Sequence, residues 1–162
     1  MTHDCEKKHW VFRVRVVDRA GALTSIASAF SNRFVSIDTV VGHGGDFSPD
    51  HDGTIVVTFW GTAGEKDEIV RVVQRLSKVI SLEEHPYESE NLRKSALIRV
   101  TRRLIPRDVA GRETFLTCEL MGHKQEAWTY FVAGSPNELD PILQDLTEQG
   151  VLKDIVYSVV GL

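Results

Sequence analysis

This chain has few cysteines and no long apolar segment. Its 162 residues include 2 cysteines, Cys5 and Cys118, without a CxxC spacing, so they cannot form a disulfide scaffold. No apolar run approaches the ~20 residues that span a bilayer, and Met1–His9 lack the apolar stretch of a secretory signal. We therefore expect a cytoplasmic protein that has two free thiols and does not associate with a membrane.

The chain also lacks a large excess of charge of either sign. The chain has 19 Lys and Arg against 23 Asp and Glu, a formal net charge of −4. This balance argues against nucleic acid as the main partner, because binding phosphates needs clustered Lys and Arg. The nearest approach to a basic run is formed by four arginines, Arg99, Arg102, Arg103 and Arg107. We expect a solvated or interfacial face there, with docking of an anion or a partner as the alternative.

Familiar catalytic motifs are missing. The sequence has no Gly-x-Ser-x-Gly elbow, no phosphate-binding Gly-rich loop and no His-Glu-x-x-His. Cys118 alternates with apolar residues, so we expect it in a strand facing the core and not as a nucleophile. Trp128, Tyr130 and Phe131 could stack bases on a sheet, but core or dimer-interface positions fit the acidic chain better. These observations predict a protein that is not an enzyme.

The first half of the chain alternates between strand and helix patterns. Trp10, Phe12, Val14 and Val16 share one face of a strand. Further strands are predicted near 35–41, 54–60 and 79–82, and apolar residues at helical spacing predict helices over 23–30 and 69–76. The resulting βαββαβ order is that of the ferredoxin-like fold, an α+β class.

The second half repeats this order incompletely. Strands are predicted over 96–101, 116–120, 128–132 and 155–160, and Ser135-Pro136-Asn137-Glu138 has the pattern of a capping box that opens a helix. The segment between the first two strands contains Pro106 and shows no sustained helical period. We therefore predict tandem units: a domain over 1–86 with a tail over 1–8, a linker over 87–94, and a truncated βββαβ domain over 95–162 without its first helix.

The turn between the first strand and the first helix is the most specific feature. It reads Asp18-Arg19-Ala20-Gly21-Ala22-Leu23. A glycine at the head of a helix leaves backbone N–H groups open to a ligand, and these groups favour an anion such as a carboxylate. A purely structural alternative is that Asp18 caps the helix and Gly21 relieves a tight turn.

Four segments resemble the ACT domain, and in particular the small, regulatory subunit of acetolactate synthase. They are the Asp18–Leu23 turn, Phe30–Val40, Val72–Ile80 and Ser95–Val100. The family reads roughly Asn-x-Pro-Gly-x-Leu at the turn and Phe-Asn-Ile-Glu-Ser-Leu on the following strand. This chain has Asp18 and Ser36 where the family has Asn, and Ala20 where it has Pro.

The resemblance implies a binding site for valine, leucine or isoleucine between two ACT domains. The ligand carboxylate would lie on the N–H groups of Gly21, Ala22 and Leu23, and Asp18 would face its ammonium. The second strand of the other domain would add Ser36 and Ile37. The resemblance thus implies seven ligand-binding residues, Asp18, Ala20, Gly21, Ala22, Leu23, Ser36 and Ile37. It also implies the thiamine-dependent acetolactate synthase catalytic subunit as a partner.

A polar insert, Gly42–Gly53, lies between the second and third predicted strands of the first domain. It carries His43, Asp46 and His51, which could bind a divalent metal, but its glycines and proline also suit an ordinary exposed hairpin loop. We expect no cofactor. The predicted function is an amino-acid-sensing regulator of branched-chain biosynthesis, and the alternative is a stand-alone ACT-type protein that binds a metal or another small ligand.

A homodimer is predicted from the open sheets. Their edge strands carry unpaired N–H and C=O groups, which a symmetric partner can satisfy. Three tryptophans, Trp10, Trp60 and Trp128, are expected to be buried where two copies meet.

Overall fold

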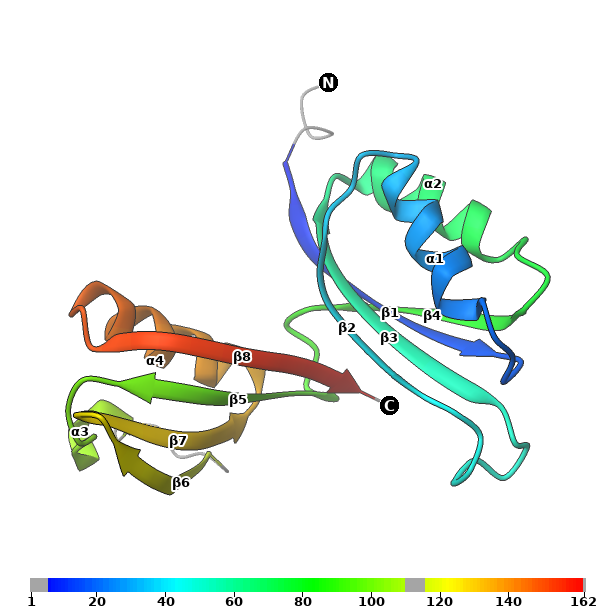
Figure 1. Ribbon diagram of the computed structural model, residues 1–162. Coiled ribbons are helices and arrows are strands. Elements are labelled where there is room, and N and C mark those ends of the chain that lie inside the picture. Colours follow the sequence, from blue (N-terminus) through cyan, green and yellow to red (C-terminus); the bar gives the residue numbers. More distant parts are fainter. Residues whose placement is uncertain (1–5, 110–115, 162) are drawn as a thin grey trace. The chain divides into compact units, whose positions relative to one another are not determined.

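The chain forms two compact units. The computed structural model describes residues 6–109 and 116–161. One unit ends at Ser89 and also includes Gly161, and the other runs from Glu90 to Val160. Each unit has one four-stranded sheet with helices packed on it (Figure 1).

The first unit has the βαββαβ order that the sequence predicts. Its elements are β1 (Lys8–Val16), α1 (Ala22–Ser31), β2 (Ile37–His43), β3 (Gly53–Gly61), α2 (Ala63–Val73) and β4 (Val79–Pro86). The sheet order is β2-β3-β1-β4, and both helices cover the same face (Figure 1). The central pair β1 and β3 is antiparallel, in register from Lys8 opposite Gly61 to Val16 opposite Gly53.

Aromatic residues form the centre of this unit's core. The alternating residues Phe12, Val14 and Val16 of β1 are buried under the helices, as the period of two predicts. The Phe12 and Phe59 rings lie edge to face at 4.8 Å between centroids, and Phe59 meets Phe30 of α1 in the same way at 4.9 Å. Such edge-to-face contacts add to the free energy gained by removing the rings from water.

Three details of this unit differ from the sequence prediction. The helix predicted over 69–76 is α2, which begins earlier, at Ala63, and ends at Val73. The predicted last strand ends near residue 82, whereas β4 continues to Pro86 because it pairs with β1 along its length, as far as Trp10 opposite Pro86. Leu23 belongs to the apolar stripe of the first helix by spacing, but its side chain is 49% exposed, and Ala22 is buried instead. Leu23 is thus available at the surface.

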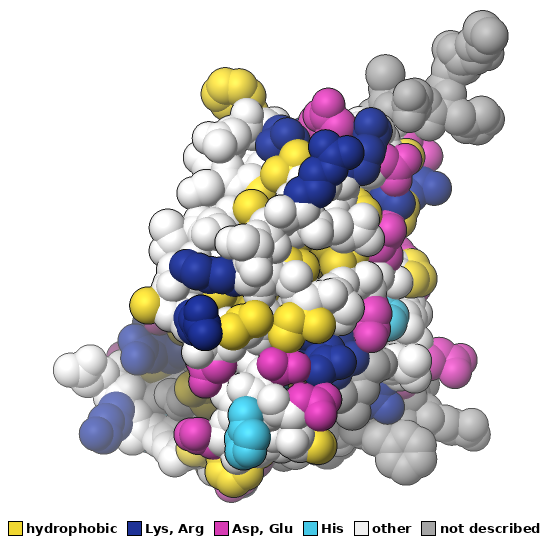
Figure 2. All heavy atoms as spheres, turned by 90° about the vertical axis from the view of Figure 1, so that its right-hand side faces the viewer, with side chains coloured by type: hydrophobic (Ala, Val, Ile, Leu, Met, Phe, Trp, Pro, Cys, Tyr) yellow, Lys and Arg dark blue, Asp and Glu magenta, His cyan; other side chains and the backbone are white. Residues whose placement is uncertain are grey.

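Several surface charges on the first unit are matched by neighbours of opposite sign. Arg13 of β1 contacts Glu83 of β4 at 3.1 Å, and Lys66 of α2 contacts Glu84 at 2.6 Å. Figure 2 shows acidic and basic side chains lying next to one another on the visible face. Pairs this exposed contribute little to the free energy of unfolding.

The second unit contains β5 (Leu92–Val100), α3 (Pro106–Val109), β6 (Thr117–Lys124), β7 (Ala127–Gly134), α4 (Pro136–Glu148) and β8 (Leu152–Gly161). Its sheet order is β6-β7-β5-β8. In the described part of the segment between β5 and β6, α3 is a single turn of 4 residues. The tandem ferredoxin-like fold with a shortened second unit is confirmed.

Several side chains of the second unit differ from expectation. Ser135 is the N-cap of α4 and Pro136 follows it, as predicted, but Ser135 makes no side-chain capping bond. The predicted core residue Cys118 is exposed, because β6 is an edge strand and α4 packs on β5 and β7. Lys94, within the predicted linker, already lies on β5, where it is buried and paired with Asp140 at 2.6 Å.

Candidate functional site: a cavity at the head of the first helix

The turn from β1 to α1 is held by backbone hydrogen bonds. Val17 N–H donates to the carbonyl of Lys78 at 2.9 Å, and Arg19 N–H donates to the carbonyl of Val17 at 2.7 Å. Gly21 is the N-cap, with φ 87° in the left-handed region that favours glycine. No side chain caps this helix, as the sequence predicts, and Ala22 N–H donates to the carbonyl of Arg19 at 3.4 Å. Among the described residues, the N–H groups of Leu23 and Thr24 are therefore the first-turn donors left for a ligand.

A cavity of about 330 Å³ opens at this turn. Apolar and small residues from β1, α1, β2 and β3 form most of its wall. Its lining residues are Val16, Val17, Asp18, Arg19, Gly21, Ala22, Leu23, Val40, Gly42, His43, Gly44, Gly53 and Ile55. Four of the seven predicted site residues, Asp18, Gly21, Ala22 and Leu23, therefore lie together around one space large enough for a small amino acid.

Asp18 does not cap the helix, so the capping alternative is wrong for this residue. Its Oδ2 accepts a hydrogen bond from the backbone N–H of Gly45 at 2.9 Å. A Cβ on Gly44 would lie 2.8 Å from the same oxygen, so the loop backbone approaches the carboxylate closely. A carboxylate accepts several hydrogen bonds, and Asp18 can therefore anchor the loop and still face a ligand.

The Gly42–Gly53 insert is folded against the site and contributes to its wall. Arg15 of β1 contacts Asp52 at 2.7 Å and Asp50 at 3.0 Å, and Ser48 N–H donates to the carbonyl of Gly45 at 3.1 Å. The metal candidates His43, Asp46 and His51 do not converge: over residues 6–109 and 116–161, no group of three His, Cys, Asp or Glu side chains could hold a metal ion. His43 Nδ1 instead lies 2.8 Å from the carbonyl oxygen of Gly44.

Lys78 lies next to the cavity lining, and the sequence analysis missed it. Its Nζ donates to the carbonyl of Ala20 at 2.6 Å, and a Cβ on Gly21 would lie 2.7 Å from Nζ. The ammonium thus lies beside the head of α1, where it adds to the positive end of the helix dipole. Ala20, predicted as a site residue, holds this lysine through its carbonyl. Lys78 belongs to the segment Val72–Ile80, which carries part of the family resemblance. Because Lys78 and Ala20 are 58 residues apart, the local sequence does not indicate that they meet.

Ser36 and Ile37 lie elsewhere in the same chain. They line a second cavity of about 340 Å³ together with Lys7, Phe34, Val35, Asp38, Trp60 and Glu65. Ile37 begins β2, whereas His43 at the first cavity ends it. Since a strand rises about 3.3 Å per residue, the two ends are roughly 20 Å apart. A single chain therefore does not bring Ser36 and Ile37 to the same small ligand as Gly21.

A polar cluster next to this second cavity was not predicted either. His9 Nε2 lies 3.1 Å from Asp38 Oδ2, and Thr58 Oγ1 donates to the same carboxylate oxygen at 3.2 Å. The His9 ring stacks between Trp60, at 4.4 Å, and Tyr87, at 3.7 Å. The cluster joins β1, β2 and β3 beside Ile37, and the sequence gives no local signal for it because its members come from separate strands.

The architecture defines the class: two four-stranded antiparallel sheets, each covered by helices, form a tandem ferredoxin-like fold of the ACT type. The structure is similar to the crystal structure of the acetolactate synthase small subunit from Thermotoga maritima, with a TM-score of 0.71 and 17% identity over 96% of each chain. The regulatory subunit of aspartate kinase from Thermus thermophilus gives a TM-score of 0.48 at 12% identity, over 87% of this chain and 91% of that chain. No protein-family model and no curated protein matches the sequence. None of the described helices is long and apolar enough to cross a membrane.

Proposed function

We propose that this protein is a non-catalytic regulator that binds a small apolar amino acid at the head of α1. The observation that supports this most directly is the cavity at which the uncapped head of α1 and the Asp18 carboxylate meet, with the Lys78 ammonium next to Gly21 of its lining. An amino acid carries the complementary groups. Its carboxylate fits the helix N-terminus and Lys78, and its ammonium fits Asp18.

The apolar wall favours an aliphatic side chain. Val16, Val40 and Ile55 line the cavity on the strand side, and Leu23 lines it at the exposed edge. Each charge-assisted hydrogen bond contributes about 1.5–3 kcal/mol, and two of them with a buried aliphatic group are enough for micromolar binding after the cost of association. We therefore propose valine, leucine or isoleucine as the ligand.

The complete site requires a second copy of the chain. Ser36 and Ile37 lie at the far end of β2 from Gly21, so they reach the ligand only from a partner protomer. Trp60 is 54% exposed beside them and provides apolar surface for such a contact. The proposal therefore includes a homodimer, with each ligand held by the α1 end of one protomer and the β2 end of its partner.

The regulated enzyme in this proposal is the catalytic subunit of acetolactate synthase. Its support is the resemblance of the sequence segments and the similarity in fold over both units. The alternative is a stand-alone ACT-type protein that binds a small ligand without a catalytic partner. Co-purification tests the difference: the catalytic subunit retained by the tagged protein supports the first function, and its absence from the retained fraction supports the second.

Calorimetry of the full chain against each of the twenty amino acids tests the ligand. Micromolar binding of valine, leucine or isoleucine is expected, with charged and aromatic amino acids at least tenfold weaker. Gly21→Leu places a side chain at the carboxylate position and should abolish binding, whereas Gly150→Leu in the second unit, where φ is also positive and a Cβ meets nothing within 4 Å, serves as a matched control. Millimolar or weaker binding of all twenty contradicts the proposal, as does a monomer mass by light scattering at the concentrations where binding occurs.

A further inference from the structure

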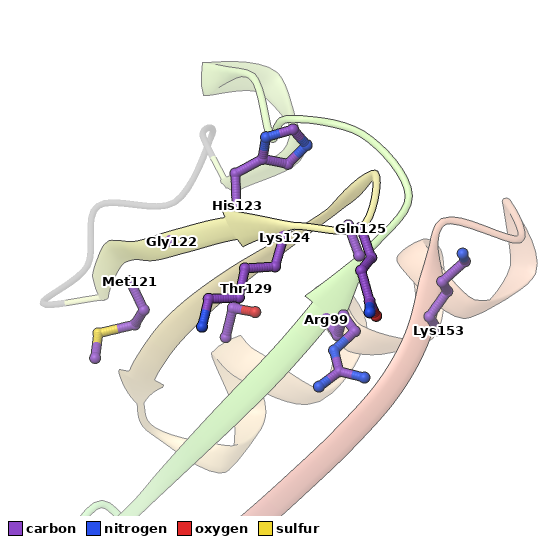
Figure 3. Close-up of a pocket in the computed structure, with 9 residues that line it drawn as sticks. Arg99, Met121, Gly122, His123, Lys124, Gln125, Thr129 and Lys153 are labelled. Carbon is purple, nitrogen blue, oxygen red and sulfur yellow. The ribbon is translucent and has the colours of Figure 1, made fainter.

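The open face of the second unit's sheet carries a cavity that the proposed amino-acid site does not use. It measures about 810 Å³ and is rich in basic and hydrogen-bonding side chains. We refer to it as the basic cavity. Its lining residues are Arg99, Met121, Gly122, His123, Lys124, Gln125, Ala127, Thr129 and Lys153 (Figure 3).

All four strands contribute to the basic cavity. Thr129 on β7 lies directly between Arg99 on β5 and Gly122 on β6 in the register of the sheet. A Cβ on Gly122 would meet nothing within 4 Å, so the space above this strand is open. Lys124 on β6 and Lys153 on β8 lie on the two outer strands (Figure 3). At about 4.8 Å between neighbouring strands, the lysines flank a space roughly 14 Å wide.

Three cations of the basic cavity have no acidic partner among the residues that the structure describes. Arg99, Lys124 and Lys153 make no ion pair and no side-chain hydrogen bond with any residue in the described ranges, and none of the described lining residues is a carboxylate. Other basic side chains of this unit are paired with carboxylates, as Lys94 is with Asp140 and Arg102 with Asp108. Like charges that face one space repel each other, and a bound anion removes that repulsion. The cavity is therefore positive within a chain of net charge −4.

We propose that the basic cavity binds a small molecule that carries two or more phosphate groups. The Arg99 guanidinium can hold one phosphate with two parallel hydrogen bonds, and the lysines supply point charges on either side. The Thr129 hydroxyl and the Gln125 amide add neutral donors on the floor and the rim. The width of the charged stripe exceeds a single phosphate, and the hollow form suits a small ligand better than the flat surface of a protein.

Titration of the full chain with inorganic tripolyphosphate at low ionic strength, monitored by calorimetry, tests this assignment. Saturable binding at one site per chain is expected, and Arg99→Gln should weaken it at least tenfold. Lys124→Gln and Lys153→Gln should each weaken it about threefold to tenfold, since each removes one charge-assisted contact. Arg75→Gln removes the same charge from an exposed position in the first unit and should leave the affinity unchanged.

Three results overturn the proposal. The first is a stoichiometry well above one ion per chain, together with equal losses of affinity in Arg99→Gln and Arg75→Gln. Such a result indicates diffuse attraction by the overall charge and not a site. The second is citrate binding as tightly as tripolyphosphate, which contradicts a phosphate site. The third is a lack of saturation of the unmodified chain at millimolar tripolyphosphate when its circular dichroism shows that it is folded. Gly21→Leu should not affect tripolyphosphate binding, so failure here is distinguishable from failure of the amino-acid site.

Discussion

The carboxylate of Asp18 and the backbone N–H of Gly45 are joined by a hydrogen bond of 2.9 Å across 27 residues. The bond connects the turn that opens α1 with the Gly42–Gly53 insert. One side chain therefore positions the insert along the cavity wall and also supplies the negative charge that the proposed ligand needs. These two roles can be separated by mutation.

Asp18→Asn should separate them. The asparagine side-chain oxygen still accepts the bond from Gly45, so the free energy of unfolding should change by less than about 0.5 kcal/mol. The lost charge weakens the contact with the ligand ammonium, so the affinity for the amino acid should fall about tenfold. Asp18→Ala is the comparison: it should lose about 1–2 kcal/mol of stability as well as the affinity. Urea denaturation and calorimetry measure the two quantities, and an unaltered affinity in Asp18→Asn would exclude the ammonium contact.

Gly45→Ala should disrupt the insert. A Cβ at this position would overlap the backbone carbonyl of His51, so the loop has to move, and a cost of about 1–3 kcal/mol is expected for such a clash. Gly42→Ala is the matched control, because its Cβ would meet Ile55 at an ordinary 3.5 Å. Denaturation of both variants measures the difference. If both are equally stable, the insert is not held in the packed conformation described above.

The phenylalanine cluster should dominate the stability of the first unit. Phe30 is 1% exposed and contacts Phe59 edge to face, so Phe30→Ala should cost about 3–5 kcal/mol through the cavity that it leaves. Phe47 in the insert is 99% exposed, and Phe47→Ala should change the free energy of unfolding by less than about 0.5 kcal/mol. Urea denaturation followed by tryptophan fluorescence compares them. Similar losses in the two variants would contradict the packing described.

The thiol of Cys118 should react slowly for an exposed residue. Partial desolvation raises its pKa above the ordinary value, and the thiolate is the reactive form. At pH 8 the thiolate fraction is then lower than in an unfolded chain, so alkylation of a Cys5→Ser variant should be slower than in the same variant in urea. The rate should continue to rise as the pH passes the ordinary thiol pKa. A rate that is already at its plateau at pH 8 would show that the pKa is lowered instead.

The sequence predicted the elements that depend on local periodicity. The alternation of Phe12, Val14 and Val16 identified the buried face of β1 correctly, and the stripe of Ile69 and Val73 identified the buried face of α2 but not its start at Ala63. Gly21 was correctly predicted at an uncapped helix N-terminus, because a left-handed residue there needs glycine. These features involve residues within one or two turns of each other, so the local sequence specifies them.

Edge positions were predicted less well. Cys118 alternates with apolar neighbours as a core residue does, but β6 ends the sheet and α4 packs on β5 and β7. Periodicity indicates which residues share a face of a strand, but it does not show whether anything covers that face. The strand order decides this, and it depends on contacts that are distant in sequence.

The amino-acid sequence by itself determined the tandem α+β order, the open helix N-terminus and the family that the first unit resembles. Only the tertiary structure decided that Asp18 holds the insert, that Lys78 lies beside Gly21 across 57 positions of the chain, and that Arg99, Lys124 and Lys153 face one cavity. The physical reason is that hydrophobic periodicity specifies each strand and helix locally, whereas the charges of a site meet only when separate strands pair in one sheet.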